Sequence, residues 1–153
     1  MEYKYIYVNF DHQRNEEGSF NDLVDKYEKY GTLYVGVDFD NTVLPYQEQS
    51  VEGYFGYNDL IQVLKDAKKY GLKICLWTVH SDEDNLKWKI DWFTKHGFEP
   101  DFVNDSPLCK HLGERRKPHF NILLDDCAGL ETAYRNLYNI VRYIEHKNNI
   151  RNV

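Results

Sequence analysis

Hydrophobic and polar positions follow two patterns along the chain: short apolar runs, and longer stretches with apolar residues three or four positions apart. The short runs are rich in β-branched and aromatic residues, which predicts strands. The longer stretches have the spacing of an amphipathic helix face. The predicted strands are 2–10, 33–38, 73–77, 101–104 and 121–124. The predicted helices run from about 20 to 30 after a Ser19 cap, from 58 or 59 to Gly71, from the 81–84 cap to Gly97, and from 129 to 147.

Strands and helices alternate in this order, which predicts an α/β fold with a parallel sheet. Right-handed crossovers then place helices on both faces, as three Rossmann-like layers. We expect one domain over 1–153, because this length suits a single core. Residues 1–31 form a strand–helix extension before the strand at 33–38, and residues 44–57 a flap-like loop. The tail at 148–153 is expected to fray.

Composition narrows the class of protein. The chain has 153 residues, 42% of them hydrophobic, and a net charge of −6. The negative charge disfavours a general nucleic-acid binder, because such proteins need basic surface for phosphates. No apolar run is long enough to span a membrane, and no signal peptide is visible. Three cysteines without metal-type spacing indicate free thiols. We therefore expect a cytoplasmic protein with no membrane partner.

Acidic side chains follow two of the predicted buried strands. Asp38 and Asp40 stand one residue apart after the strand at 33–38, so they point to the same side while strand geometry lasts. Asp125 and Asp126 follow the strand at 121–124, and Thr78 ends the strand between them. Because ligands bind at the carboxyl ends of the strands in open α/β sheets, these side chains predict one crevice.

Four carboxylates in one crevice repel one another unless a cation neutralises them. Carboxylate oxygens are hard ligands, which favour Mg²⁺, and the sequence offers no His and Cys set of the kind that zinc prefers. The alternative interpretation of Asp125 and Asp126 is a cap for the helix that follows, and both can hold. The alternative for Asp38 and Asp40 is a polar turn after a strand.

The ordered set resembles the motifs of the haloacid dehalogenase (HAD) superfamily. Residues 38–43, Asp-Phe-Asp-Asn-Thr-Val, resemble its motif I. Residues 73–78 resemble motif II, an apolar strand ending in Ser or Thr, and residues 121–126 resemble motif IV, an apolar strand ending in paired acids. Lys117 stands where the motif III lysine is expected, with Lys110 as a competitor. Each motif alone is weak, but the ordered set is specific.

The resemblance implies a phosphatase that works through an aspartyl-phosphate. Asp38 would be the nucleophile and Asp40 the general acid and base. Thr78 would hydrogen-bond a phosphoryl oxygen, and Lys117 would neutralise charge. Mg²⁺ would be held by Asp38, the Asp40 backbone carbonyl and Asp125, with Asp126 a second ligand or an orienting group.

Two departures from the family pattern concern the turn and the cap. Asn41 stands where glycine is commoner, which we expect to alter the turn and not the chemistry. The stretches from Asp40 to Thr78 and from Thr78 to Lys117 are too short for a large cap domain. The predicted site is therefore open, with 44–57 as its lid.

The substrate class stays open between a small phosphate monoester, which we favour, and a nucleotide or polynucleotide end. The basic run at 115–117 and the aromatic flap favour the second. A catalytically idle HAD-like binding module is the alternative from another class. His80 and His119 each lie two residues past a predicted site residue, where an ordinary loop histidine is the favoured interpretation.

Overall fold

The computed structural model describes residues 16–45, 57–105 and 119–151. Within these ranges it contains four helices and four strands. The helices are α1 (Glu16–Tyr30), α2 (Asn58–Lys69), α3 (Glu83–Lys95) and α4 (Leu130–Arg151). The strands are β1 (Tyr34–Val37), β2 (Lys73–Leu76), β3 (Phe102–Val103) and β4 (Ile122–Leu124).

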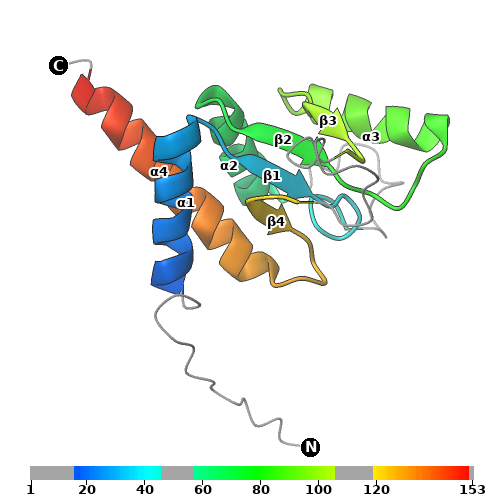
Figure 1. The fold of residues 1–153 in the computed structure, drawn as a ribbon. Coiled ribbons are helices and arrows are strands. Elements are labelled where there is room, and N and C mark those ends of the chain that lie inside the picture. Colours follow the sequence, from blue (N-terminus) through cyan, green and yellow to red (C-terminus); the bar gives the residue numbers. More distant parts are fainter. Residues whose placement is uncertain (1–15, 46–56, 106–118, 152–153) are drawn as a thin grey trace, which may run out of the picture.

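The four strands form one parallel sheet in the order β3-β2-β1-β4 (Figure 1). β1 is central and pairs with β2 on one side and β4 on the other. The register aligns the last residues of these three strands, because Val37 is paired with both Leu76 and Leu124. Whatever follows the three strands in the sequence therefore emerges side by side at one edge of the sheet.

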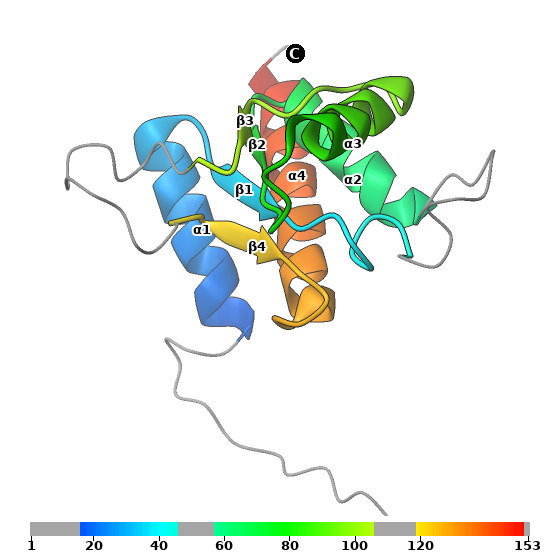
Figure 2. The ribbon, with the colours of Figure 1, turned by 90° about the vertical axis from the view of Figure 1, so that its right-hand side faces the viewer.

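The helices surround the sheet in layers. Viewed toward the carboxyl ends of the strands (Figure 2), α1 lies on one side of the sheet and α2, α3 and α4 on the other. α1 also contacts α4, where the Tyr143 hydroxyl donates to the Glu28 carboxylate at 2.8 Å and Lys147 pairs with the same carboxylate. The predicted α/β fold with a Rossmann-like parallel sheet between helices is confirmed.

The core lies between the sheet and the helices. Val35 and Val37 of β1 are fully buried, and so are Ile74, Leu76 and Leu124 of the neighbouring strands. Gly36 leaves room for an aromatic ring on the opposite face of β1. A Cβ at Gly36 would lie 2.5 to 2.8 Å from ring atoms of Phe120, which is closer than van der Waals contact permits.

Two helix ends differ from the prediction. α1 begins at Glu16, so Ser19 lies inside the helix and does not cap it. α4 continues to Arg151 through most of the tail that was expected to fray. Burial of Ile144 and the Lys147 contact with α1 hold its last turns.

The remaining predicted elements agree with the structure to within a few residues, as far as they are described. The strand predicted at 2–10 and most of the flap-like loop at 44–57 lie outside the described residues. None of the helices in the described ranges is long and apolar enough to cross a membrane.

Candidate active site at the carboxyl ends of the strands

Asp38, Thr78 and Asp125 come from the aligned ends of the three central strands. The Asp38 amide donates to the Leu124 carbonyl at 2.9 Å, which places Asp38 beside Asp125. On the other side, the Trp77 amide donates to the Val37 carbonyl at 2.8 Å. Trp77 therefore lies beside Asp38, and Thr78 lies one position further along the strand direction. The predicted convergence of these three residues is therefore a property of the backbone pairing.

The loop after β1 turns sharply and carries Asp40 with it. The Phe39 carbonyl accepts from the amides of Thr42, Val43 and Leu44, and the Asn41 amide donates to the Leu44 carbonyl at 2.8 Å. Asn41 has a φ of 60°, in the left-handed region that asparagine tolerates better than most residues. The asparagine thus replaces the expected glycine without preventing the turn.

Thr42 connects Asp38 to the end of β4. Its side chain is fully buried, and its hydroxyl donates to Asp38 Oδ2 at 3.0 Å. The same hydroxyl accepts from the Asp126 amide at 2.9 Å. One buried side chain therefore orients the Asp38 carboxylate and fixes the backbone of the acidic pair after β4.

The electrostatics of Asp38 are unusual for an aspartate. Burial, followed by the charges of Asp125 and Asp40, raises the pKa of Asp38 from its usual value of 3.8 to about 6. Hydrogen bonds from the Thr42 hydroxyl and the Phe39 amide oppose this rise. The site therefore disfavours an ionised Asp38, and a bound cation or a neighbouring donor would relieve that cost.

Asp40 and Thr78 are joined by a lysine that the sequence reasoning missed. Lys89 Nζ donates to Asp40 Oδ2 at 2.7 Å and to Thr78 Oγ1 at 2.9 Å. It also lies 3.0 Å from His80 Nδ1, which is itself 3.6 Å from Asp40 Oδ2. The Lys89 side chain is only 1% exposed. The site thus contains a buried cation from α3.

A signal for Lys89 is present in the sequence. Leu86, Ile90 and Phe93 form the apolar stripe of the third helix, and Lys89 falls within this stripe. A charged residue among core-facing positions is buried only when it is paired. The stripe alone does not name the partner, because the partner comes from strand ends 9 to 49 positions away.

α3 is held over the strand ends by its own cap and by Phe39. The Asp82 side chain accepts from the Asn85 amide at 2.9 Å and begins the helix. The fully buried Phe39 ring makes edge-to-face contacts with Trp88, Trp92 and Phe93, at centroid distances of 5.3 to 5.6 Å. These contacts fix the helix rotation that carries the Lys89 side chain to Asp40.

Asn104 fixes the loop that follows β2. Its side-chain Oδ1 accepts from the Thr78 amide at 2.8 Å, and its Nδ2 donates to the His80 carbonyl at 3.3 Å. Its backbone has a φ of 49°, which an asparagine adopts at low cost. Thr78 is thereby held from two neighbouring strand ends.

The acidic pair after β4 lies toward solvent. Asp125 is partly buried, while Asp126 and Cys127 are exposed. Candidate ligand atoms of the three residues lie within 4.8 Å of one another. The nearby charge of Asp126 is the main reason that the pKa of the Cys127 thiol is raised, which makes it a poor thiolate ligand or nucleophile.

Of the other predicted site residues, the structure describes some and not others. Lys117 and its competitor Lys110 lie outside the described residues, so the motif III lysine stays a prediction. His119 is exposed and stands two residues before the Asn121 that donates its amide to β1. His80 Nδ1 lies 3.0 Å from Lys89 Nζ, so this loop histidine lies beside the candidate site, and its role stays a prediction.

The donor set fits Mg²⁺. Asp38 and Asp125 emerge from adjacent strands, and the charge of Asp125 is one cause of the raised pKa of Asp38. Oxygen ligands of this kind, with repulsion that a cation would relieve, suit a hard divalent ion. In the described part of the chain, Cys127 is the one sulfur donor beside these carboxylates. Soft metal ions prefer sites with several sulfur ligands, so this set suits them less well.

The fold defines a class, an α/β protein with a Rossmann-like parallel sheet and acidic side chains at its carboxyl edge. Neither a family model nor a curated protein matches this chain. Among solved structures, the chain is similar to a conserved protein from Bacteroides thetaiotaomicron, with 24% identity and a TM-score of 0.51. The match covers 62% of this chain and 76% of that protein. At this identity the similarity shows a shared fold.

Proposed function

We propose that the protein is a Mg²⁺-dependent phosphate monoester hydrolase of the haloacid dehalogenase type. The observation that supports this most is the alignment of β1 with both neighbours. It brings Asp38, Thr78 and Asp125 to one edge, in the order that the family's motifs require. Phosphoryl transfer depends mainly on positioned groups and charge stabilisation, and this edge offers both.

In the first half of the reaction, a carboxylate oxygen of Asp38 attacks phosphorus. The bond from phosphorus to the ester oxygen breaks, and its electron pair stays on that oxygen. The leaving oxygen takes a proton from the Asp40 carboxyl and departs as an alcohol. Asp38 then carries the phosphoryl group as an acyl phosphate. The Thr42 hydroxyl, at 3.0 Å from Asp38 Oδ2, orients the nucleophile.

In the second half, water attacks the phosphorus of phospho-Asp38. The Asp40 carboxylate takes a proton from that water, and the bond from phosphorus to the Asp38 oxygen breaks. Inorganic phosphate leaves, and both aspartates return to their starting states. The Thr78 side chain would donate to a phosphoryl oxygen in both halves, and Lys117 would contribute positive charge.

Mg²⁺ would be held by Asp38, the Asp40 backbone carbonyl and Asp125, with Asp126 as a further ligand or an orienting group. When bound, it would neutralise charge on the carboxylates and on the phosphoryl oxygens. The raised pKa of Asp38 supports this assignment, because a cation there offsets a cost that burial and Asp125 impose.

The test is hydrolysis of p-nitrophenyl phosphate by wild type with Mg²⁺, wild type with EDTA, and Asp38→Asn with Mg²⁺. We expect turnover that needs the metal and falls by on the order of 1,000-fold or more in the variant. Acid quench followed by mass spectrometry should find a phosphoryl group on the peptide containing Asp38. Asp101→Asn is the matched control, because Asp101 is a part-buried aspartate at the other edge of the sheet.

Turnover that survives Asp38→Asn would show that Asp38 is not the nucleophile. If wild type binds Mg²⁺ but turns over no phosphate monoester in a panel of sugar, nucleotide and aryl phosphates, the chain is a binding module and the proposal is wrong.

A further inference from the structure

Lys89 carries the most unusual charge in the described part of the chain. Its ammonium is nearly excluded from solvent, and it lies 5.0 Å from the centroid of the Phe39 ring. An unpaired ammonium in such a place would be strongly unfavourable, and even a paired one often contributes less stability than an apolar side chain of similar size. The core of α3 therefore has no need of a lysine at this position.

The partners of Lys89 come from two different strand ends. Asp40 belongs to the loop after β1, whereas Thr78 and His80 belong to the loop after β2. One ammonium thus joins the two loops that carry the candidate acid–base residue and the candidate phosphoryl donor.

The direction of these hydrogen bonds has a chemical consequence. An ammonium donates and never accepts, so Thr78 Oγ1 is an acceptor toward Lys89. The His80 amide also points at this oxygen, at 3.5 Å. The hydroxyl hydrogen of Thr78 must then point away from Lys89, which makes Thr78 a donor toward a ligand. The same ammonium donates to Oδ2 of Asp40 and so holds one oxygen of that carboxyl group in place.

We propose that Lys89 is the positioning residue for the acid–base step, and this inference rests on the proposed function. Lys89 aims the Asp40 carboxyl group at the leaving oxygen and orients the Thr78 hydroxyl toward the phosphoryl group. It does so from behind both residues, buried in α3 and out of contact with the substrate. A variant without this ammonium retains the nucleophile but delivers the proton poorly.

Leaving groups of different basicity separate this role from a general loss of structure. Phenolate is more basic than p-nitrophenolate, so phenyl phosphate needs protonation of its leaving oxygen more than p-nitrophenyl phosphate does. A misplaced general acid therefore slows the first ester more than the second. A variant that is merely partly unfolded slows both by the same factor.

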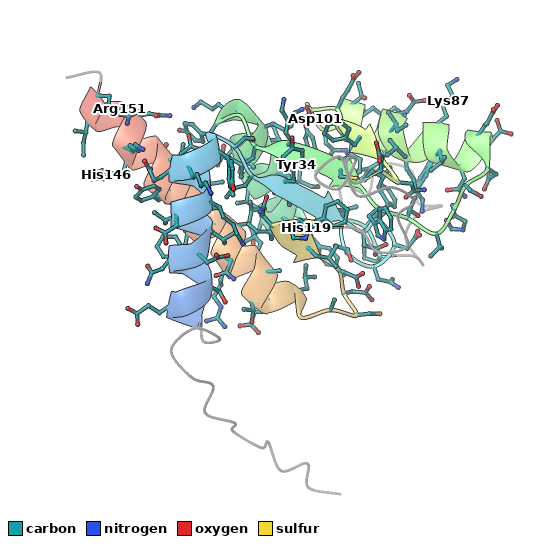
Figure 3. All side chains as sticks on the ribbon, in the orientation of Figure 1. Tyr34, Lys87, Asp101, His119, His146 and Arg151 are labelled. Atoms are coloured by element: carbon teal, nitrogen blue, oxygen red, sulfur yellow. The ribbon has the colours of Figure 1, made fainter. Side chains whose placement is uncertain are left out.

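The experiment compares Lys89→Met with Lys87→Met, in the full chain with saturating Mg²⁺. Lys87 is the matched control because it lies on the same helix but is exposed, on its outer side (Figure 3). We expect Lys89→Met to lower kcat/KM about 100-fold for phenyl phosphate and about 10-fold for p-nitrophenyl phosphate, within the range of general acid catalysis. Lys87→Met should leave both values within about twofold of wild type.

Asp40→Asn and the double variant complete the test. Asp40→Asn should change the ratio between the two esters in the same direction, and adding Lys89→Met to it should change that ratio by less than about twofold. This is the behaviour of two residues that act as one unit. The melting temperature of each variant identifies any loss that is due to unfolding.

The outcomes distinguish the two proposals. If wild type turns over both esters with Mg²⁺ but Lys89→Met leaves their ratio unchanged, the positioning role is wrong and the proposed function stands. Independent effects of Lys89→Met and Asp40→Asn on the ratio would also overturn the role. If wild type turns over no phosphate monoester, the proposed function fails and the role of Lys89 in the reaction fails with it.

Discussion

Each edge of the sheet holds a partly buried aspartate, Asp101 at the amino edge and Asp38 at the carboxyl edge, and the two differ in the charges around them. At the amino edge, Asp101 accepts from the Ile74 amide at 2.8 Å and pairs with Lys68 at 2.8 Å and Lys73 at 3.6 Å (Figure 3 labels Asp101). Burial raises its pKa, but these hydrogen bonds and charges outweigh burial and hold the pKa of Asp101 below its usual value.

At the carboxyl edge the balance is reversed. Burial, together with the charges of Asp125 and Asp40, raises the pKa of Asp38 to about 6. Lys89, the buried cation that the described residues place in that region, is engaged by Asp40, Thr78 and His80. Within the described residues, Asp101 is thus paired with two lysines, whereas Asp38 has no ion pair with a cationic side chain. The difference supports a structural role for Asp101 and the functional role proposed for Asp38.

The largest expected effect is a loss of catalytic turnover after a substitution at the carboxyl edge. Asp125→Asn removes a charged candidate ligand, so we expect kcat/KM with p-nitrophenyl phosphate to fall by at least about 100-fold. The Mg²⁺ concentration needed for half-maximal activity should rise as well. Asp101→Asn is the matched control and should stay within about twofold. Equal losses of kcat/KM in the two variants would contradict the assignment of turnover to the carboxyl edge.

Next in size is the stability of the amino edge. Asp101→Ala leaves the Ile74 amide without its acceptor and two lysines without their partner, so we expect a loss of about 2 kcal/mol at pH 7. Because the folded-state pKa of Asp101 is lowered, the stability it contributes is present above the usual aspartate pKa. It is lost as pH falls through the folded-state value. Urea unfolding at pH 7 and at acidic pH measures this, and a pH-independent difference would contradict it.

A smaller effect of opposite sign is expected for Asp38 in the absence of metal. Its folded-state pKa of about 6 lies above the usual value of 3.8, so ionisation costs stability as pH rises through this window. Asp38→Asn should therefore stabilise the metal-free protein by about 1 kcal/mol at pH 7.5, after allowance for solvent screening. The gain should vanish near pH 4.

Thermal unfolding in EDTA at both pH values measures this gain. Mg²⁺ should raise the melting temperature of wild type at pH 7.5 more than that of Asp38→Asn, because the variant has lost a charged ligand. A variant that is less stable than wild type at pH 7.5 would show that Asp38 is not under electrostatic strain.

The smallest expected effect concerns the lysine beside Asp101. Lys68 is 27% exposed, against 1% for Lys89, so its ion pair is screened by water. Lys68→Met should change the free energy of unfolding by no more than about 0.5 kcal/mol and leave turnover unchanged. Urea unfolding measures the first and the aryl phosphate assay the second. A loss as large as that of Asp101→Ala would mean that Lys68 alone accounts for the stability that the interactions of Asp101 contribute.

Much of the fold was predictable because it depends on local pattern. The apolar runs predicted β1, β2 and β4, and the helical spacing predicted α2, α3 and α4 close to their observed bounds. The start of α1 was predicted wrongly. A serine beside a glycine resembles a cap, but the helix already includes residues that precede Ser19. The local sequence pointed to Ser19 as the start, and the structure shows this residue inside the helix.

The candidate site was predictable where it follows from strand ends and missed where it follows from helix packing. Asp38, Thr78 and Asp125 stand at fixed positions after apolar runs, so parallel pairing alone brings them together. Lys89 stands in the middle of a helix, and its partners depend on how α3 rotates around Phe39. Thr42 belonged to the quoted motif, but its link to the Asp126 amide depends on how β1 and β4 are placed.

The sequence by itself determined the order of strands and helices, the parallel class of the sheet and the acidic character of its carboxyl edge. These follow from side-chain periodicity and from the position of each acid relative to an apolar run. Only the tertiary structure decided which charges meet. Lys89 reaches Asp40 across 49 positions, and Asp101 reaches Lys68 across 33, because ion pairs depend on distance in space and on exclusion of water. Neither the distance nor the exclusion of water can be predicted from the local order of apolar and polar residues.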